Sequence, residues 1–179
     1  IEEAAGYAGI QSILSKPFFV TNFKRCIEQA RKEQQLQGKG QATEKEKMTL
    51  KGMRFLIADD NDLNAEILEE LLKMEGADCD RAVNGKEAVE MFARAEEGRY
   101  NIILMDIKMP VMNGYDATKE IRRLKKKEAA KIPIFAMTAN AFAEDIRTCM
   151  EAGMDAHIAK PVDLDLLEEN IRIYMQAKA

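Results

Sequence analysis

The sequence predicts an α/β protein with a doubly wound parallel sheet, in which five strands are covered by helices on both faces. Two observations support this fold class. Apolar runs and segments of helical spacing alternate five times between residues 51 and 179, and such alternation is typical of sheets built from β-α units. Most of the runs are continuously apolar rather than alternating, as expected of strands that are buried on both faces.

The first two units occupy residues 53–97. The apolar run Met53–Ala58 predicts a buried strand, and Asn61–Met74 has apolar residues three and four positions apart, which is the spacing of a helix. Ala77–Val83 predicts a shorter and less apolar strand. Gly85–Glu97 again has its apolar residues on one side of a helix.

Three further units complete the alternation. We expect strands at Asn101–Met105, Ile132–Met137 and Asp155–Ala159, and helices at Tyr115–Lys126, Ala141–Ala152 and Leu164–Gln176. Gly153 indicates the end of the middle helix, because glycine readily adopts the left-handed conformation that closes a helix.

Residues 37–50 are polar, contain two glycines and lack apolar periodicity, so we interpret them as a linker. They separate a short N-terminal part, residues 1–36, from a body at 51–179.

Composition and charge exclude several classes of protein. Hydrophobic residues make up 46% and charged residues 32% of the chain, which is ordinary for a soluble globular protein. The net charge of −4 does not favour nucleic acid as a partner. No apolar run approaches the roughly 18 residues of a membrane span. No signal peptide is visible, and a first residue Ile rather than Met indicates a piece of a longer polypeptide.

Cysteine and histidine usage narrows the chemistry further. Cys26, Cys79 and Cys149 are far apart, which argues against a disulfide framework or a zinc site and favours the reducing cytoplasm. The single histidine, His157, argues against His-based metal sites and Ser-His-Asp catalysis. Chemistry in this chain must therefore rest on carboxylates, lysine, threonine and backbone groups.

Polar residues stand where the predicted strands end. Asp59 and Asp60 follow the first strand, Asp106 the third, Thr138 the fourth and Lys160 the fifth. In a parallel sheet these ends meet at one edge, where ligands bind. Three carboxylates in one place repel each other unless a cation is present, and their hard oxygens suit Mg²⁺, which commonly shares its shell with a phosphate. The carboxylate that the metal does not fully occupy is the candidate nucleophile.

Four motifs stand at these strand ends in one order, and together they resemble the receiver domain of two-component response regulators over residues 53–179. The motifs are Ile57-Ala58-Asp59-Asp60-Asn61, Met105-Asp106-Ile107-Lys108-Met109-Pro110 with Gly114, Met137-Thr138-Ala139, and Lys160-Pro161. The resemblance implies a flavodoxin-like five-stranded sheet in the order 2-1-3-4-5.

The resemblance also implies a role for each site residue, with Mg²⁺ as the cofactor. Asp106 would be the phosphoacceptor, Asp60 a direct metal ligand beside it, and Asp59 a ligand acting mainly through water. The backbone carbonyl of Lys108 would complete the protein ligands. The remaining roles are phosphoryl binding by Lys160, Thr138 and the small Ala139, a cis peptide bond at Lys160-Pro161, and a switch involving Thr138 and His157.

The implied function is that of a phosphorelay module. Asp106 would take a phosphoryl group from a phosphohistidine on a histidine kinase or a histidine phosphotransfer domain. The switch would then alter the face made by the fourth helix (Ala141–Ala152), the fifth strand and the fifth helix of the body, through which self-association is also expected. The chain alone is not expected to be an enzyme.

The N-terminal part repeats the end of the body. Residues 8–17 align without a gap with residues 152–161, so that Lys16-Pro17 matches Lys160-Pro161. We interpret residues 1–36 as a strand-helix remnant of an upstream receiver that lacks its acid pair and acceptor. Tandem receivers resemble the C-terminal half of a hybrid histidine kinase, and such a parent protein is expected to be cytoplasmic or anchored to a membrane.

Several alternatives remain open on the sequence alone. Asp59 and Asp60 favour helix N-caps as well as metal sites, and His157 suits a partly buried structural position. The basic run at 122–127 suits a solvated helix end that complements the helix dipole better than a nucleic-acid contact. A pseudo-receiver that never takes phosphate is a second function. A haloacid-dehalogenase-like aspartyl-phosphate hydrolase is a third, but it needs a second Asp where this chain has Lys108.

Overall fold

The computed structural model describes residues 49–139 and 143–177. The predicted remnant at 1–36 lies outside the described residues, as does the predicted linker at 37–50 apart from its last two residues. Leu50, the last of them, is fully buried, so it belongs to the folded body rather than to a linker. A single apolar residue among polar neighbours carries no periodicity, and the sequence pattern therefore gives no sign of its burial.

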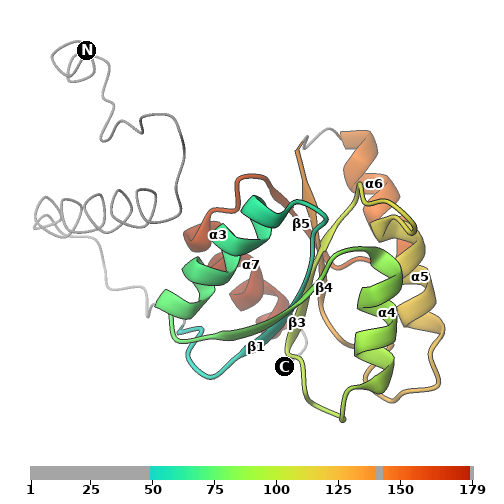
Figure 1. Ribbon diagram of the computed structural model, residues 1–179, viewed down its shortest axis with the longest axis horizontal. Helices are drawn as coiled ribbons and strands as arrows, with labels where there is room; N and C mark the ends of the chain where they lie inside the picture. Colours follow the sequence, from blue (N-terminus) through green and yellow to red (C-terminus); the bar gives the residue numbers. More distant parts are fainter. Residues whose placement is uncertain (1–48, 140–142, 178–179) are drawn as a thin grey trace, which may run out of the picture. The chain divides into compact units, whose positions relative to one another are not determined.

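Five parallel strands form one sheet in the order β2-β1-β3-β4-β5 (Figure 1). The strands are β1 (Arg54–Ala58), β2 (Asp78–Ala82), β3 (Ile102–Asp106), β4 (Ile134–Thr138) and β5 (Ala156–Ala159). Both the predicted doubly wound sheet and its order are confirmed. Because Ala58 pairs with Met105 in the register of β1 and β3, the residues that follow, Asp59 and Asp106, lie at the same edge of the sheet.

Helices cover the sheet on both faces (Figure 1). On one face lie α3 (Asp62–Met74) and α7 (Leu164–Ala177), and on the other lie α4 (Gly85–Arg94), α5 (Gly114–Arg123) and α6 (Ala143–Ala152). The strands supply side chains to both layers. Leu56 packs in the cluster under α4 and α5 with Phe92 and Ile121. Among the described residues no helix combines the length and apolar character that crossing a bilayer requires.

Asparagine begins each of the first three helices of the body. Asn61, Asn84 and Asn113 accept a hydrogen bond through their side chains from the backbone N–H three residues ahead, at 2.9–3.0 Å. These bonds satisfy donors that the first helical turn leaves free. Since the helices begin just after the strand ends, the caps also fix the loops at the carboxyl edge of the sheet.

Gly114 lets the loop after β3 turn back closely on its own strand. Its N–H donates to the carbonyl of Ile107 at 3.0 Å. A Cβ atom at this position would collide with the backbone carbonyl oxygen of Asp106. Glycine is therefore required by the close approach of two backbone segments.

The basic run after α5 differs from its interpretation as a solvated helix end. Arg122 donates to the carbonyls of Gly153, Ala129 and Ile132 at 2.8–3.0 Å and to the Asp155 carboxylate at 2.8 Å. These contacts join α5 to the loop after it and to the start of β5. The interpretation is wrong for this residue, because the carbonyls that hold it come from distant positions in the chain.

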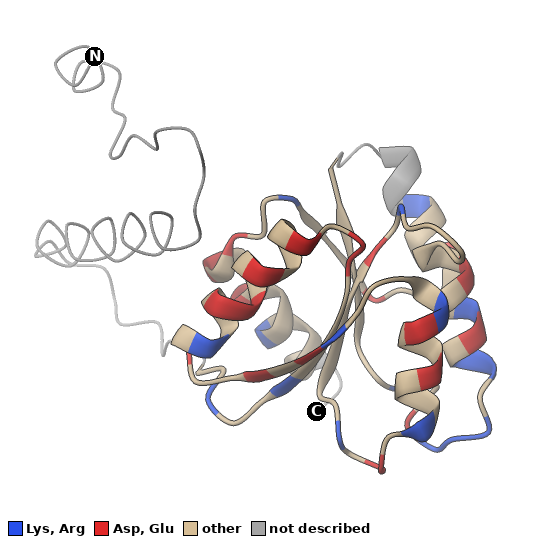
Figure 2. Cartoon of the chain, in the orientation of Figure 1, with Lys and Arg blue, Asp and Glu red and all other residues tan. Residues whose placement is uncertain are grey.

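Lys126 is also held by the fold. Its Nζ donates to the carbonyls of Phe92 and Ala95 at 2.9 and 2.8 Å, pairs with Glu128 at 2.9 Å and lies 4.6 Å from the centre of the Phe92 ring. It thus supplies a C-terminal cap to α4, which ends at Arg94 rather than at the predicted Glu97. Figure 2 shows Lys and Arg on α5 and along the loop that follows it.

Candidate functional site

Three carboxylates gather at the carboxyl edge of the sheet. Asp59 and Asp60 follow β1, and Asp106 is the last residue of β3. One oxygen of each lies within 4.8 Å of the others. Asp59 and Asp106 are buried, whereas Asp60 is exposed. Neither Asp59 nor Asp60 caps α3, because Asn61 does so, and the acid pair is therefore free for another role.

Lys160, one residue beyond β5, bridges two of these acids. Its Nζ lies 2.6 Å from Asp59 Oδ2 and 2.7 Å from Asp106 Oδ2. The Lys160-Pro161 peptide bond is cis. The second oxygen of Asp59 accepts from the backbone N–H of Asn61 at 3.0 Å, so both oxygens of this buried carboxylate are engaged.

Burial and the neighbouring opposite charge shift the pKa of Asp106 in opposite directions, and the same holds for the pKa of Lys160. Burial raises the pKa of Asp106 above its ordinary value and Asp59 raises it further, while the bonds from Lys160 and the Lys108 N–H lower it. Burial alone would lower the pKa of Lys160, but its bonds to Asp106 and Asp59 outweigh this effect and the pKa is raised. Lys160 therefore carries a fixed positive charge at neutral pH.

A cavity of about 520 Å³ opens over the acids. Its lining combines carboxylates, amides and a lysine, from Asp60, Asn61, Asn64, Asp106, Ile107, Lys108, Asn113, Tyr115, Thr138, Ala139 and Lys160. Asp59 is not in this lining and lies beneath Lys160, at 1% exposure. The volume is ample for a phosphoryl group together with hydrated Mg²⁺.

Three lining residues were not expected from the sequence. Asn64, Asn113 and Tyr115 stand in the first turns of α3 and α5 or at their start. Both helices begin right after the loops that carry the acids, so nearness to a predicted helix start is the signal that could have found all three.

The two residues predicted to form a switch lie on the neighbouring strands β4 and β5. Thr138 ends β4, is 8% exposed and lines the cavity with Ala139. His157 is half-buried in β5, where it pairs with Ala136 rather than with Thr138. It is not among the residues that line the cavity.

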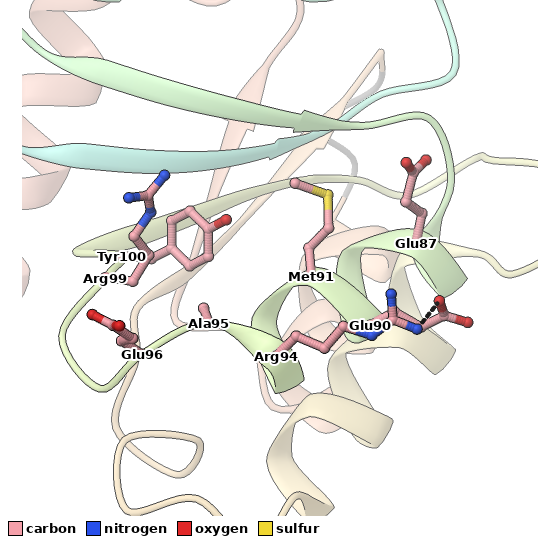
Figure 3. Close-up of a pocket in the computed structure, with 8 residues that line it drawn as sticks. All are labelled: Glu87, Glu90, Met91, Arg94, Ala95, Glu96, Arg99 and Tyr100. Carbon is pink, nitrogen blue, oxygen red and sulfur yellow. Dashed lines mark hydrogen bonds and ion pairs between the residues drawn. The ribbon is translucent and has the colours of Figure 1, made fainter.

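A second hollow, of about 590 Å³, lies along α4 and the segment before β3 (Figure 3). Both arginines of its lining are held in ion pairs, Arg94 with Glu90 at 3.3 Å and Arg99 with Asp80, an acid outside the lining, at 3.0 Å. It lacks the convergent acids and the shared lysine of the first cavity.

Comparison with known proteins agrees with this geometry. A family model for the response regulator receiver domain matches residues 55–172. Hybrid signal transduction histidine kinase L of Dictyostelium discoideum is 35% identical over 122 residues, which cover 68% of this chain and 7% of that protein. The match spans only 7 to 15% of the length of the first curated relatives.

Solved receiver domains superpose on the described body. The receiver domain of sensor histidine kinase PA1611 from Pseudomonas aeruginosa, solved with a magnesium ion in its active-site cleft, is 34% identical with a TM-score of 0.61, covering 70% of this chain and 98% of that one. A second match is to the receiver domain of Ssk1 from Saccharomyces cerevisiae, which was solved in complex with the histidine phosphotransfer protein Ypd1. The two chains are 30% identical with a TM-score of 0.59, and the match covers 68% of this chain and 88% of that one.

Proposed function

Since this chain belongs to the response regulator receiver domain family, we propose that it accepts a phosphoryl group from a partner phosphohistidine onto Asp106, with Mg²⁺ as cofactor. One observation carries the proposal. Three carboxylates lie within 4.8 Å of one another, and Lys160 is shared between the acceptor and Asp59. When all three acids are ionised, one ammonium leaves the group two negative charges in excess, which suits a divalent cation.

The donor set fits Mg²⁺, because it offers oxygen atoms only and one carboxylate is open to solvent. We assign the direct contacts to Asp60, Asp106 and the carbonyl of Lys108. Asp59 would act through water, since it is 1% exposed and, unlike Asp60 and Asp106, does not line the cavity. Bound there, Mg²⁺ offsets charge on the carboxylates and on the phosphoryl oxygens.

In the transfer, an oxygen of Asp106 forms a bond to phosphorus as the bond from phosphorus to the donor imidazole nitrogen breaks, and that imidazole leaves with its electron pair. Lys160 is fixed 2.7 Å from the acceptor oxygen, so its ammonium would meet the phosphoryl oxygens as they arrive. The hydroxyl of Thr138 would donate to one of these oxygens, and the small side chain of Ala139 leaves room for them.

The response would use the residues beside the acceptor. Movement of Thr138 toward the phosphoryl group would vacate space near β5 that the half-buried His157 ring can enter. The face built by α6, β5 and α7 would change in consequence. Met150, Leu166 and Ile173 are exposed on its two helices, and we propose this face for regulated self-association.

We propose a histidine kinase or a histidine phosphotransfer domain as the phosphodonor. Support comes from the Ypd1 complex of the similar Ssk1 receiver, and from two exposed apolar side chains beside the cavity. Leu63, 42% exposed, lies between the lining residues Asn61 and Asn64 at the start of α3, and Val111, 80% exposed, stands in the loop after Asp106. Val111 also has φ +67°, a strained conformation for a β-branched residue that tends to occur at functional sites.

Acetyl phosphate and intact-mass measurement test the acceptor. With Mg²⁺, the 179-residue chain should gain the mass of one phosphoryl group, and Asp106→Asn should abolish the gain. Asp78→Asn, at the far end of the sheet with a side chain that is 71% exposed, is the matched control and should be phosphorylated as the wild type is. An equal gain in Asp106→Asn would refute the assignment.

We further propose that the chain has no kinase activity and that kinase activity resides in its parent protein. Incubation with γ-labelled ATP and Mg²⁺ should leave the chain unlabelled, whereas a phosphorylated histidine phosphotransfer protein should label Asp106. Label from ATP alone would contradict this division of roles.

A further inference from the structure

Arg81 on the edge strand β2 reaches across to the segment that carries the acid pair. Its Nη2 donates to the Asp62 carboxylate at 2.7 Å and to the backbone carbonyl of Asp59 at 3.3 Å. Its side chain is 22% exposed, and that of Asp62 is 91% exposed. Within the described residues all hydrogen bonds of the Arg81 side chain go to the acid turn, which we define as Asp59–Asp62.

The backbone explains why such a contact matters there. Strands β1 and β2 stay in register up to the pair of Ala58 and Ala82, and the ladder ends with the bond from Asp59 N–H to the Ala82 carbonyl at 3.1 Å. Beyond that bond, the contact between β2 and the acid turn in the described residues is made by the guanidinium of Arg81. It holds the turn from the side opposite to Lys160.

Two nitrogens of the Arg81 guanidinium differ in their hydrogen bonding, because Nη2 bonds the acid turn and Nε does not. Its Nε is buried and has no hydrogen-bond partner in the described part of the chain. A buried donor without an acceptor is unfavourable, so the side chain keeps this position through its bonds to the acid turn. Removing those bonds would release both the arginine and the turn.

We propose that Arg81 is a positioning residue that holds the acid turn in the geometry needed for Mg²⁺, an inference that rests on the proposed function. Contacts behind a metal ligand typically change metal affinity by about 10–100-fold when they are removed. Because Arg81 acts on the backbone of the turn, we expect the lower end of this range.

Charge alone predicts the opposite sign. A cation beside a metal site repels Mg²⁺, so its removal would strengthen binding if Arg81 acted only through its charge. The direction of the change in affinity therefore separates positioning from simple electrostatics.

Calorimetric titration of the full chain with Mg²⁺ provides the test. Arg81→Met should weaken binding about tenfold, which is about 1.4 kcal/mol, and Arg81→Lys should recover part of the loss. Arg99→Met is the matched control, because Arg99 also donates to a carboxylate, that of Asp80, but it lies in the segment before β3, at the amino end of the sheet and away from the acid turn. Unchanged or tighter binding in Arg81→Met, with the control unchanged, would overturn the proposal.

A measurement without metal separates failure of this inference from failure of the proposed function. The backbone N–H of Asn61 donates a hydrogen bond to Asp59 Oδ1. Hydrogen exchange at this N–H should accelerate about fivefold or more in Arg81→Met but not in Arg99→Met. Asp62→Asn should accelerate exchange in the wild-type background and add nothing to Arg81→Met. If the wild type binds no Mg²⁺, the proposed metal site fails, yet unchanged exchange in Arg81→Met remains the result that would overturn positioning by Arg81.

Discussion

Replacing Arg122 with methionine should destabilise the fold far more than the same change at the next residue. Methionine keeps most of the length of the apolar stem but removes every hydrogen bond of the guanidinium. Three carbonyls and the Asp155 carboxylate then lose a charged donor. Asp155 retains one bond, from the Ile134 N–H at 3.0 Å, so its carboxylate is not left wholly unsatisfied.

The magnitude follows from how much water can replace the guanidinium. The side chains of Arg122 and Asp155 are 18% and 21% exposed, so the carbonyls can be only partly rehydrated. A hydrogen bond to a charged group contributes about 1.5–3 kcal/mol when buried. Taking about 1 kcal/mol for each of the four bonds gives a loss of about 4 kcal/mol, in the range for a buried pair that loses one partner. For a domain of this size we expect a fall in Tm of about 10–15 °C.

Arg123 is the matched control, because it carries the same charge at the same helix end. Its side chain is 73% exposed and, in the part of the chain that the structure describes, bonds only to Glu120, at 2.9 Å, which is worth about 0.5 kcal/mol or less. Urea denaturation of both variants, with Asp155→Asn added to each, gives the free energies of unfolding and the coupling between Arg122 and Asp155. A loss in Arg122→Met no larger than that in Arg123→Met would refute the reasoning.

Three further predictions rest on other parts of the fold. Gly114→Ala should lower the free energy of unfolding by about 3 kcal/mol or more, measured in urea, because its Cβ would collide with the Asp106 carbonyl. Burial raises the pKa of the Cys79 thiol to about 11, so alkylation of Cys79 at pH 8, followed by mass mapping, should be much slower in the folded than in the unfolded chain. Because the unfolded chain loses the thiol proton at a lower pH than the folded chain does, the free energy of unfolding should fall from pH 9 to 11 more in the wild type than in Cys79→Ala. Without metal, Asp60→Ala should leave Tm unchanged or higher by relieving repulsion, whereas Asp59→Ala should lower it, because a buried partner of the site lysine is lost; a fall of equal size in both would contradict this picture of the acid cluster.

Much of the site could be predicted because its chemistry follows from strand ends. The strands are continuous apolar runs, so the first polar residue after each run marks the carboxyl edge of the sheet. That reasoning places Asp59, Asp106 and Lys160 together from the sequence alone. It does not predict that the lysine bridges the two carboxylates, because this depends on side-chain geometry.

Helix ends and side-chain contacts were harder to predict from the sequence where they depend on a residue far away in the chain. The ends of α4 and α5 were predicted three residues too late, at Glu97 and Lys126, because nearby residues carry no stop signal. For α4 the stop comes from Lys126, which caps carbonyls 31 and 34 positions earlier. Arg81 shows the same limit, since its partners lie 19 and 22 positions away.

The close approach at Gly114 gives the site a stiff side and a compliant side. On the stiff side, α5 starts with its backbone against the carbonyl of Asp106, and Gly85 at the start of α4 is packed in the same way against the carbonyl of Met112. Neither helix start can advance without a collision between backbones. A strain that begins at Asp106 would therefore be relieved toward the ends of β4 and β5, where Thr138 and Lys160 reach the cavity with side chains that can rotate. Gly114 and Gly85 thus direct a structural change at Asp106 away from α4 and α5 and toward β4 and β5.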